Sequence, residues 1–273
     1  MMNFQTITHA TTRYNLHTHT QFCDGHATME EFVRAAIDQG FTHLGFTPHS
    51  PVHIDSPCNM ARHRLPDYLA ELNRLREVYG NQIAIYAGME LDYIDGTEQA
   101  DPSLTALPLD YRIGSVHFIP SFVNPQEYID IDGRYEKFKA KMGFFFHNDI
   151  EAVVRSFFVQ SMKMLDAGGF DVVGHFDKIG FNASLFSPGI DEQPWYDTLV
   201  QRLFEAIMDY HYVVEINTKA WQLHNRFFPN RRYFGLLKKN HTPIIINSDA
   251  HYPALLDSGR AEALQSLQHA SIN

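Results

Sequence analysis

The chain has 273 residues, of which 44% are hydrophobic, and its ionisable side chains give a formal net charge of −10 at pH 7. An acidic surface repels phosphate backbones and anionic membranes, which excludes broad nucleic-acid binding. Two cysteines, Cys23 and Cys58, are too few for a disulfide framework. Residues 1–13 lack the basic and apolar regions of a signal peptide, and no apolar run approaches the roughly 18 residues of a membrane span. We therefore expect a cytoplasmic protein that binds neither nucleic acid nor a membrane.

Short apolar runs alternate with helix-like segments along the whole chain. The predicted strands are Tyr14–Thr18, His43–Thr47, Ile83–Ala87, Arg112–Val116, Asp171–Gly174, Val213–Asn217 and Pro243–Asn247. After the first strand, apolar residues from Met29 to Ile37 recur at helical spacing, and a capping box of Thr28 and Glu31 marks where this helix begins. Further helices are expected near residues 66–79, 149–168, 195–210, 231–239 and 258–268.

This repeated alternation of strands and helices predicts an α/β fold with a parallel sheet and helices outside it. Seven strands without an obvious switch point favour closure into a barrel. No low-complexity segment, heptad repeat or break in composition divides the chain, so we expect a single domain over residues 1–273.

Residue types that bind metals follow six of the seven predicted strands. They are His17, His19, His49, Glu90, His117, His175, Asp249 and His251. Only the strand 213–217 offers no ligand, although Glu215 and Asn217 are polar there. Because the C-terminal ends of parallel barrel strands meet on one face, these side chains are expected to converge on a metal site.

The two ends of the chain carry ligand pairs with the same spacing. His17 and His19 are two residues apart in an extended segment, so both project to the same side, and Asp249 and His251 repeat this spacing near the C-terminus. Closure of a barrel would place the two pairs side by side, whereas an open sheet need not. This pairing is the reason for expecting a closed barrel.

These residues lie in an ordered set of short motifs. The motifs are His17-Thr18-His19, Thr47-Pro48-His49-Ser50, Gly88-Met89-Glu90-Leu91-Asp92-Tyr93, Ser115-Val116-His117-Phe118, Gly174-His175 and Ser248-Asp249-Ala250-His251. Together they resemble the polymerase-and-histidinol-phosphatase (PHP) family over about residues 14–255, and within it the histidinol-phosphatase branch. The resemblance implies a distorted seven-stranded (β/α)7 TIM-like barrel that holds three divalent metal ions. It also implies hydrolysis of a phosphate monoester, L-histidinol phosphate, to L-histidinol and phosphate in histidine biosynthesis.

The resemblance further implies how the ligands share the three ions. One ion would lie among His17, His19, Glu90 and Asp249, a second would share Glu90 and add His117 and His175, and the third would take His26, His49 and His251. Sites rich in imidazole suit Zn, Fe or Mn better than Mg, which prefers oxygen ligands. Water bound to such ions is a strong nucleophile near neutral pH, because its pKa falls from about 15.7 to about 7.

Two positions differ from the pattern of the family. The family has a histidine shortly after the first pair, and His26 matches it with a spacing one residue longer, so that Asp24 is a competing candidate; we favour His26. An acidic residue commonly precedes the histidine of the second strand, but Pro48 stands there in this chain. The orienting role of that acid is therefore unassigned, and Asp24 is a candidate for it.

Hydrolysis also needs a proton donor and cations that bind phosphate. Asp249 and His251 are the candidates, by position, for protonating the leaving alcohol. The candidates for phosphate binding lie near predicted strand ends, and they are Lys178, Lys219, Arg226, Arg231 and Arg232.

Residues 119–148 form the longest stretch without a predicted element, and long loops in compact domains are usually functional. Histidinol phosphate carries an ammonium group and an imidazole, which acidic and aromatic side chains would recognise. We therefore expect this loop to form the wall that determines specificity, with Phe122, Glu127, Tyr128, Asp130 and Asp132.

Three alternatives remain at this point. The first is a related phosphoesterase that acts on nucleotides or another small phosphate ester. The second is a metal-dependent amidohydrolase, a class that usually has one or two ions, the pair often bridged by a modified lysine; here His117 and the terminal Asp249 and His251 supply further ligands. The third is a structural metal domain without activity. The sequence does not predict the oligomeric state.

Overall fold

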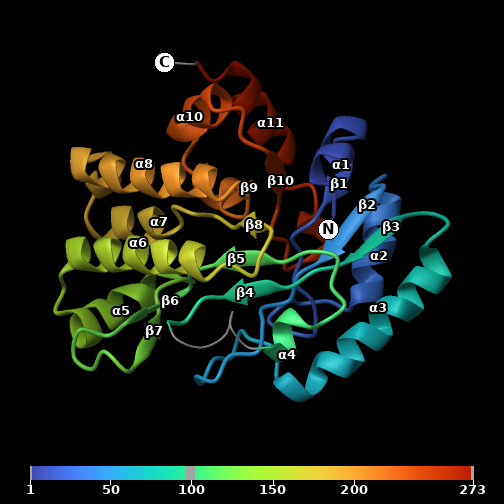
Figure 1. Cartoon of the computed structure of the whole chain (residues 1–273), viewed down its shortest axis with the longest axis horizontal. Coiled ribbons are helices and arrows are strands. Elements are labelled where there is room, and N and C mark those ends of the chain that lie inside the picture. Colours follow the sequence, from blue (N-terminus) through green and yellow to red (C-terminus); the bar gives the residue numbers. More distant parts are fainter. Residues whose placement is uncertain (1, 96–101, 272–273) are drawn as a thin grey trace.

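The computed structural model describes residues 2–95 and 102–271, which form helices around two parallel sheets (Figure 1). A five-stranded sheet has the order β10-β9-β8-β5-β4, and a three-stranded sheet has the order β1-β2-β3. The strands are β1 (Tyr14–Asn15), β2 (His43–Phe46), β3 (Ala84–Ala87), β4 (Glu90–Asp92), β5 (Ile113–Ser115), β8 (Val172–Val173), β9 (Val213–Asn217) and β10 (Ile244–Asn247). The predicted α/β fold with parallel pairing is confirmed.

Helices cover the outer faces of both sheets (Figure 1). They are α1 (Phe4–Ala10), α2 (Met29–Asp38), α3 (Leu65–Tyr79), α4 (Pro102–Thr105), α5 (Tyr135–Phe146), α6 (Ile150–Ala167), α7 (Ile179–Phe186), α8 (Pro194–Asp209), α9 (Trp221–His224), α10 (Phe234–Lys239) and α11 (Arg260–His269). The predicted capping box of α2 is present, with the Thr28 hydroxyl accepting from the Glu31 backbone and the Glu31 carboxylate accepting from the Thr28 backbone. Within the ranges 2–95 and 102–271, no helix combines the length and apolar character needed to cross a membrane.

The chain passes from one sheet to the other immediately after β3. Gly88 and Met89 connect β3, which pairs with β2, to β4, which pairs with β5. A Cβ atom on Gly88 would lie 2.6 Å from the Thr47 methyl group and 2.7 Å from the Tyr111 ring. Only glycine allows this close approach, which brings Glu90 to the first position of β4.

The predicted closed barrel of seven strands is not confirmed, because the backbone ladders form two separate sheets. Over the described residues, isolated bridges join their edges, one pairing Thr18 with Ala250 and one pairing His49 with Glu90. The physical reason is that β1 contributes only two residues to its ladder, and that the chain changes sheets between β3 and β4. Both bridges lie at or next to predicted metal ligands.

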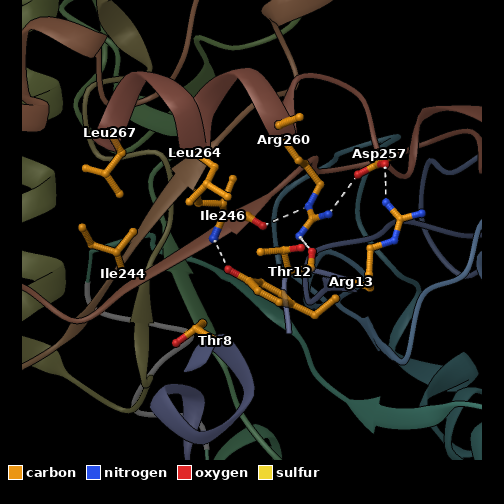
Figure 2. A pocket seen from close by; sticks show the side chains of 11 residues that line it. Thr8, Thr12, Arg13, Ile244, Ile246, Asp257, Arg260, Leu264 and Leu267 are labelled. Carbon is orange, nitrogen blue, oxygen red and sulfur yellow. Dashed lines mark hydrogen bonds and ion pairs between the residues drawn. The ribbon is translucent and has the colours of Figure 1, made fainter. Parts of the chain in front are cut away.

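Side chains replace the missing backbone ladder between β1 and β10. The backbone amide of Ile246 donates to the Tyr14 hydroxyl at 3.0 Å, and Arg260 lies next to Ile246 (Figure 2). The Arg260 guanidinium donates from Nε to the Ile246 carbonyl at 3.1 Å and from Nη2 to the Thr12 carbonyl at 3.0 Å. Deeper in the contact, the Leu16 amide donates to the Asn247 side chain at 2.8 Å.

The stretch 119–148 is not irregular, contrary to the prediction. An antiparallel hairpin of β6 (Phe118–Pro120) and β7 (Tyr128–Asp130) pairs Phe118 with Asp130, and helix α5 follows it. The Phe145 carbonyl accepts from the Phe122 backbone amide at 3.0 Å, so the helix packs back onto the hairpin. The acidic residues of this stretch are therefore held on a rigid element.

Removing the Arg260 guanidinium is expected to destabilise the fold. Arg260 is 5% exposed and supplies the charged hydrogen bonds that join β10 to the segment before β1. We expect Arg260→Met to lower the free energy of unfolding by about 2–4 kcal/mol, measured by urea denaturation at a fixed metal concentration. Arg202→Met, at an exposed position of α8, is the control and is expected to change it by about 0.5 kcal/mol or less. Equal effects of the two substitutions would contradict this role.

Candidate metal centre

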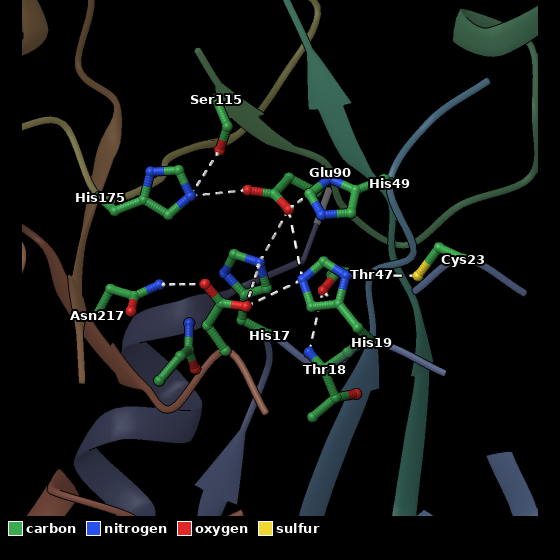
Figure 3. A network of polar contacts seen from close by, with 12 residues as sticks. His17, Thr18, His19, Cys23, Thr47, His49, Glu90, Ser115, His175 and Asn217 are labelled. Carbon is green, nitrogen blue, oxygen red and sulfur yellow. Dashed lines mark hydrogen bonds and ion pairs between the residues drawn. The ribbon is translucent and has the colours of Figure 1, made fainter. Parts of the chain in front are cut away.

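The C-terminal ends of the parallel strands bring the predicted ligands of both sheets into one buried cluster (Figure 3). The members are His17 and His19 after β1, His49 after β2, Glu90 at the start of β4, His117 after β5, His175 after β8, and Asp249 and His251 after β10. Residues 230 positions apart in the sequence meet here, since His19 Nε2 lies 3.1 Å from Asp249 Oδ1.

The Glu90 carboxylate lies at the centre of the cluster. Its Oε1 is 2.9 Å from His175 Nε2 and 3.6 Å from His117 Nε2. Its Oε2 is 3.3, 3.4 and 3.2 Å from nitrogen atoms of His17, His19 and His49 respectively. One carboxylate that is 1% exposed therefore faces five imidazoles.

The cluster divides into groups whose ligand atoms all lie within 4.8 Å of one another. These groups are His17, His19 and Asp249; Glu90, His117 and His175; His49, Asp92 and His117; and His19, Asp24, His49 and His251. The second group has the members of one ion site that the family resemblance implies, and the first has those of another except Glu90. Zinc, iron and manganese all accept such sets of imidazole and carboxylate ligands.

Several buried polar atoms of the cluster make no hydrogen bond. Among the described residues these atoms include His17 Nε2, His19 Nε2, Asp24 Oδ1, His49 Nδ1 and Glu90 Oε2. Each unsatisfied buried polar atom costs about 1–3 kcal/mol, more when the group is charged. Divalent cations among these atoms would satisfy all of them, so the residues present fit a metal centre.

The pKa values of two carboxylates and two imidazoles in the cluster also fit metal binding. Burial alone raises the pKa of a carboxyl, but the neighbouring imidazoles, first that of His17, hold the pKa of Glu90 well below its usual value. The pKa of Asp249 is likewise held well below its usual value, because nearby cationic groups outweigh burial. Burial lowers the pKa of His19 well below its usual value and that of His175 to about 4. The surrounding carboxylates, in contrast, raise the pKa of His17 well above its usual value and that of His49 to about 9, against the effect of burial. These two imidazoles would therefore lose a proton when they bind a metal, because the ligand form is the neutral imidazole.

Glu215 orients a ligand, a role that the sequence did not indicate. Its Oε1 accepts a hydrogen bond from His17 Nδ1 at 2.7 Å, so that His17 Nε2 faces Glu90. Asn247 and Asn217 donate to the two Glu215 oxygens at 2.9 and 3.0 Å. Such carboxylate–histidine contacts fix the tautomer of a metal ligand. The available signal was an acid between the apolar residues Val214 and Ile216 of the strand 213–217.

Asp92 plays the same part for two other histidines. One of its oxygens accepts from His117 Nδ1, and the other lies 3.2 Å from His49 Nδ1. The Asn59 side chain also donates to Asp92. Asp92 thus takes the orienting role that Pro48 cannot supply.

The structure places Asp24, and not the favoured His26, in the cluster. Asp24 Oδ1 lies 3.3 Å from His251 Nε2 and 3.7 Å from His19 Nδ1. The His26 side chain is exposed and stacks on Tyr252, with ring centroids 4.3 Å apart. A tight turn is the reason, since the Thr20 carbonyl accepts from the amides of both Cys23 and Gly25 and directs the intervening Asp24 inward.

Two of the five candidate cations lie at the cluster. Lys219 Nζ is 3.3 Å from both Asp249 Oδ1 and His251 Nε2. Lys178 Nζ is 2.6 Å from Asp132 Oδ2, which is 4.0 Å from His117 Nε2.

The three arginines pair with residues outside the cluster. Arg226 donates to Asp191 at 2.9 Å, Arg232 pairs with Asp197 at 2.6 Å, and Arg231 donates to the Asn225 side chain at 2.6 Å. Each has a local partner in the loops and helices after β8 and β9. Their predicted contact with phosphate therefore has no support in this geometry.

A cavity of about 560 Å³ opens onto the cluster. Its inner side includes Asp24, His49, Asp92, His117, Lys219 and His251, and the hairpin side includes Glu127, Tyr128, Asp130 and Asp132. Phe122 does not line it, because its ring packs edge-to-face on Phe146 at 5.2 Å; Phe118 and Phe145 supply the aromatic surface instead. The hairpin side of the cavity, called the hairpin wall below, is thus acidic and aromatic, as expected, although Phe122 is not part of it.

Substituting Glu215 is expected to weaken metal binding although it touches no proposed ion. Glu215→Gln removes the charge that fixes His17, so metal affinity should fall by about 10- to 100-fold. Competition with a fluorescent chelator measures this affinity. Glu205→Gln, at an exposed site of α8, should leave it unchanged. A metal affinity of Glu215→Gln equal to that of the parent would show that His17 binds metal without the Glu215 charge.

The number of metal ions bound per chain shows whether Asp24 or His26 is a ligand. Because Asp24 contacts the cluster and His26 stacks outside it, Asp24→Ala should lose about one ion per chain after dialysis, and His26→Ala should lose none. Elemental analysis of both variants gives the answer. Loss from His26→Ala alone would restore the original preference.

Comparisons with known proteins agree with this geometry. A family model described as the PHP domain matches residues 15–219, most of the chain. A protein of Deinococcus radiodurans named "probable histidinol-phosphatase" is 28% identical over an alignment that covers 92% of this chain and 91% of that protein. The histidinol-phosphatase of Bacillus subtilis is 26% identical, and the alignment covers 86% of this chain and 92% of that protein.

Two solved structures share the fold. The hisK protein of Listeria monocytogenes superposes with a TM-score of 0.81 at 20% identity, covering 91% of this chain and 99% of that chain. The histidinol phosphate phosphatase of Lactococcus lactis, complexed with zinc, L-histidinol and phosphate, gives a TM-score of 0.73 at 17% identity, covering 96% of this chain and 95% of that chain. With the family model matching the segment that carries His17, Glu90 and His175, the chain belongs to the PHP domain family.

Proposed function

We propose that this protein is a metal-dependent phosphatase that hydrolyses L-histidinol phosphate to L-histidinol and phosphate, a step of histidine biosynthesis. The observation that carries the proposal is the buried Glu90 carboxylate facing five imidazoles at the base of a cavity. Relatives over nearly the whole chain are named histidinol-phosphatases, and a structural neighbour holds zinc, L-histidinol and phosphate.

Three divalent ions are proposed, and the first two would share Glu90. His17, His19, Glu90 and Asp249 would hold the first; Glu90, His117 and His175 the second; and Asp24, His49 and His251 the third. When bound, the ions supply an activated water as nucleophile and offset negative charge on the phosphoryl oxygens. The orienting carboxylates Glu215 and Asp92 hold the imidazoles in place for this.

Lys178 and Lys219 are proposed to bind the phosphoryl oxygens. Both ammonium groups lie beside the cluster, and they approach it from different strand ends, Lys178 after β8 and Lys219 after β9. Two cations on separate elements restrict the orientation of a phosphate as well as attracting it.

Of the two candidate proton donors, only His251 lines the cavity, where its side chain is 12% exposed. Its Nδ1 lies 3.0 Å from the Asp249 carbonyl and its Nε2 faces Asp24 in the third group, so as a metal ligand it would have no proton free for the leaving oxygen. Asp249 is 2% exposed, and its two oxygens are already occupied by His19, Lys219 and Asn217. We therefore assign both residues to metal binding and neither to the donor role.

The hairpin wall supports histidinol as the alcohol part of the ester. Glu127 and Asp130 place carboxylates across the cavity from the metal ligands, where an ammonium group would be attracted, and Tyr128 adds an aromatic surface. Lys137 and Lys141 also line the cavity, and they favour the second candidate, a more anionic ester such as a nucleotide. Asp130 already pairs with Lys141 at 2.8 Å, which reduces the charge available to such a ligand.

We also propose that the two sheets act as one distorted seven-stranded barrel in a single domain. The bridges next to the ligands and the side-chain contacts between β1 and β10 support this. In this arrangement β3 and β4 together supply one of the seven strands.

Phosphate release from a substrate panel tests the proposed function. The protein is stripped with a chelator, reloaded with Zn, Mn or Fe, and assayed on L-histidinol phosphate, AMP and p-nitrophenyl phosphate. We expect no activity without metal, and a kcat/KM for L-histidinol phosphate at least about 10-fold above that for AMP. A preference for AMP would establish the nucleotide alternative, and no phosphate release with any metal would refute the phosphatase assignment.

A further inference from the structure

Lys178 and Asp132 form a largely buried ion pair at the edge of the metal cluster. Their charged atoms are 2.6 Å apart, and their side chains are 10% and 30% exposed. Lys178 lies three residues after the ligand His175, and Asp132 lies two residues beyond β7. The pair therefore links the hairpin to the strand end that carries a metal ligand.

The backbone around Asp132 is fixed by hydrogen bonds to elements on either side. The Ile131 amide donates to the His117 carbonyl at 2.9 Å, and the Asp132 amide donates to Asp130 Oδ1 at 2.8 Å. The Asn182 side chain, in α7, donates to the Ile131 carbonyl at 3.3 Å. Asp132 is thus held rigidly, whereas Lys178 has a flexible four-carbon stem.

The position of the Asp132 carboxylate requires an explanation. Its Oδ2 is 4.0 Å from His117 Nε2, so it lies beside the place where a phosphate dianion would bind, and like charges repel there. Burying an ion pair also costs free energy, unless good geometry and further hydrogen bonds offset the loss of solvation. Burial lowers the pKa of Lys178, but the carboxylates of Asp132, Asp249 and Glu90 outweigh it and raise that pKa above its usual value.

We propose that Asp132 is a positioning residue, which holds the Lys178 ammonium group against the phosphoryl group of the substrate. An ammonium group has three donors, and Asp132 occupies one of them, so two remain for phosphoryl oxygens. This proposal rests on the proposed phosphatase function. In this role Asp132 differs from the other acids of the hairpin. Its partner is Lys178 of the enzyme, and not the ammonium group of the ester.

The two roles for Asp132 give different results with two substrates. p-Nitrophenyl phosphate has a phosphate group but neither ammonium nor imidazole. If Asp132 acts through Lys178, Asp132→Asn should lower kcat/KM about 10- to 100-fold for both esters, mainly through KM. If Asp132 instead contacts the ammonium group of L-histidinol phosphate, p-nitrophenyl phosphate should be unaffected, which would overturn the proposal.

A double-mutant cycle tests whether Asp132 acts through Lys178. In a Lys178→Met background, Asp132→Asn should cost less than about 2-fold, because the ammonium group it positions is absent. A full cost in that background would overturn the proposal. Asp95→Asn removes the partner of Lys163, another Asp–Lys pair that lies outside the cavity, and should change kcat/KM less than about 2-fold.

Binding of inorganic phosphate provides a readout that does not depend on turnover. Calorimetric titration of the metal-loaded protein should show a phosphate Kd about 10- to 100-fold higher for Asp132→Asn, with the metal content unchanged. An unchanged Kd, or loss of a metal ion, would overturn the proposal. A parent that binds phosphate but releases none from any ester would refute the proposed function alone.

A second substitution covers the case in which Asp132→Asn does not fold. Asp132→Glu keeps the charge and moves it by one methylene group, so the ammonium group is held in a displaced position. An intermediate rise in phosphate Kd is expected, and a Kd equal to that of the parent would overturn the proposal.

Discussion

The electrostatics of one buried carboxylate determine most of the site. Glu90 is 1% exposed and lies within 3.6 Å of five imidazoles that come from four other strand ends. Taken alone, this arrangement is unfavourable, because several desolvated polar atoms of the cluster, Glu90 Oε2 among them, make no hydrogen bond. Cations placed between them convert the same atoms into ligands. The free energy of metal binding is therefore coupled to the packing of the strand ends.

Side chains hold the strand ends together where the backbone ladders are short. β1 contributes two residues to its ladder, and Tyr14, Asn247 and Arg260 supply the further hydrogen bonds that join it to β10. Asn247, which accepts from the Leu16 amide in this contact, also donates to Glu215, the acid that orients His17. The loss of a regular barrel and the gain of oriented ligands thus have the same structural origin.

Much of the site could be predicted from the sequence, because parallel strands that carry a ligand at their C-terminal ends must converge. The exchange of His26 for Asp24 could not, because it depends on a turn in which two amides share the Thr20 carbonyl. A Cβ on Gly25 would lie 2.3 Å from the His19 carbonyl, so this turn requires glycine. The Asp24-Gly25 pair was therefore a readable signal for the turn, although not for the direction of the carboxylate.

The phosphate-binding cations were harder to predict than the ligands, for a physical reason. A metal ligand is fixed by its strand, whereas a lysine or arginine beyond a strand end pairs with whichever acid the fold brings near it. Arg226 and Arg232 find Asp191 and Asp197, which are about 35 positions earlier in the chain. Such pairings depend on tertiary packing, which periodicity and spacing do not report.

The charge balance of the site supports the proposed number of three ions. With the imidazoles neutral as ligands, the ionised side chains are six carboxylates and two ammonium groups, which give a formal charge of −4; they are Asp24, Glu90, Asp92, Asp132, Glu215, Asp249, Lys178 and Lys219. One divalent ion leaves −2 and two leave zero, so neither attracts a phosphate monoester dianion. A third ion makes the site +2, which matches the charge of that dianion and directs it to the cluster. The same balance explains how a chain with a net charge of −10 can bind an anionic substrate at one place on its surface.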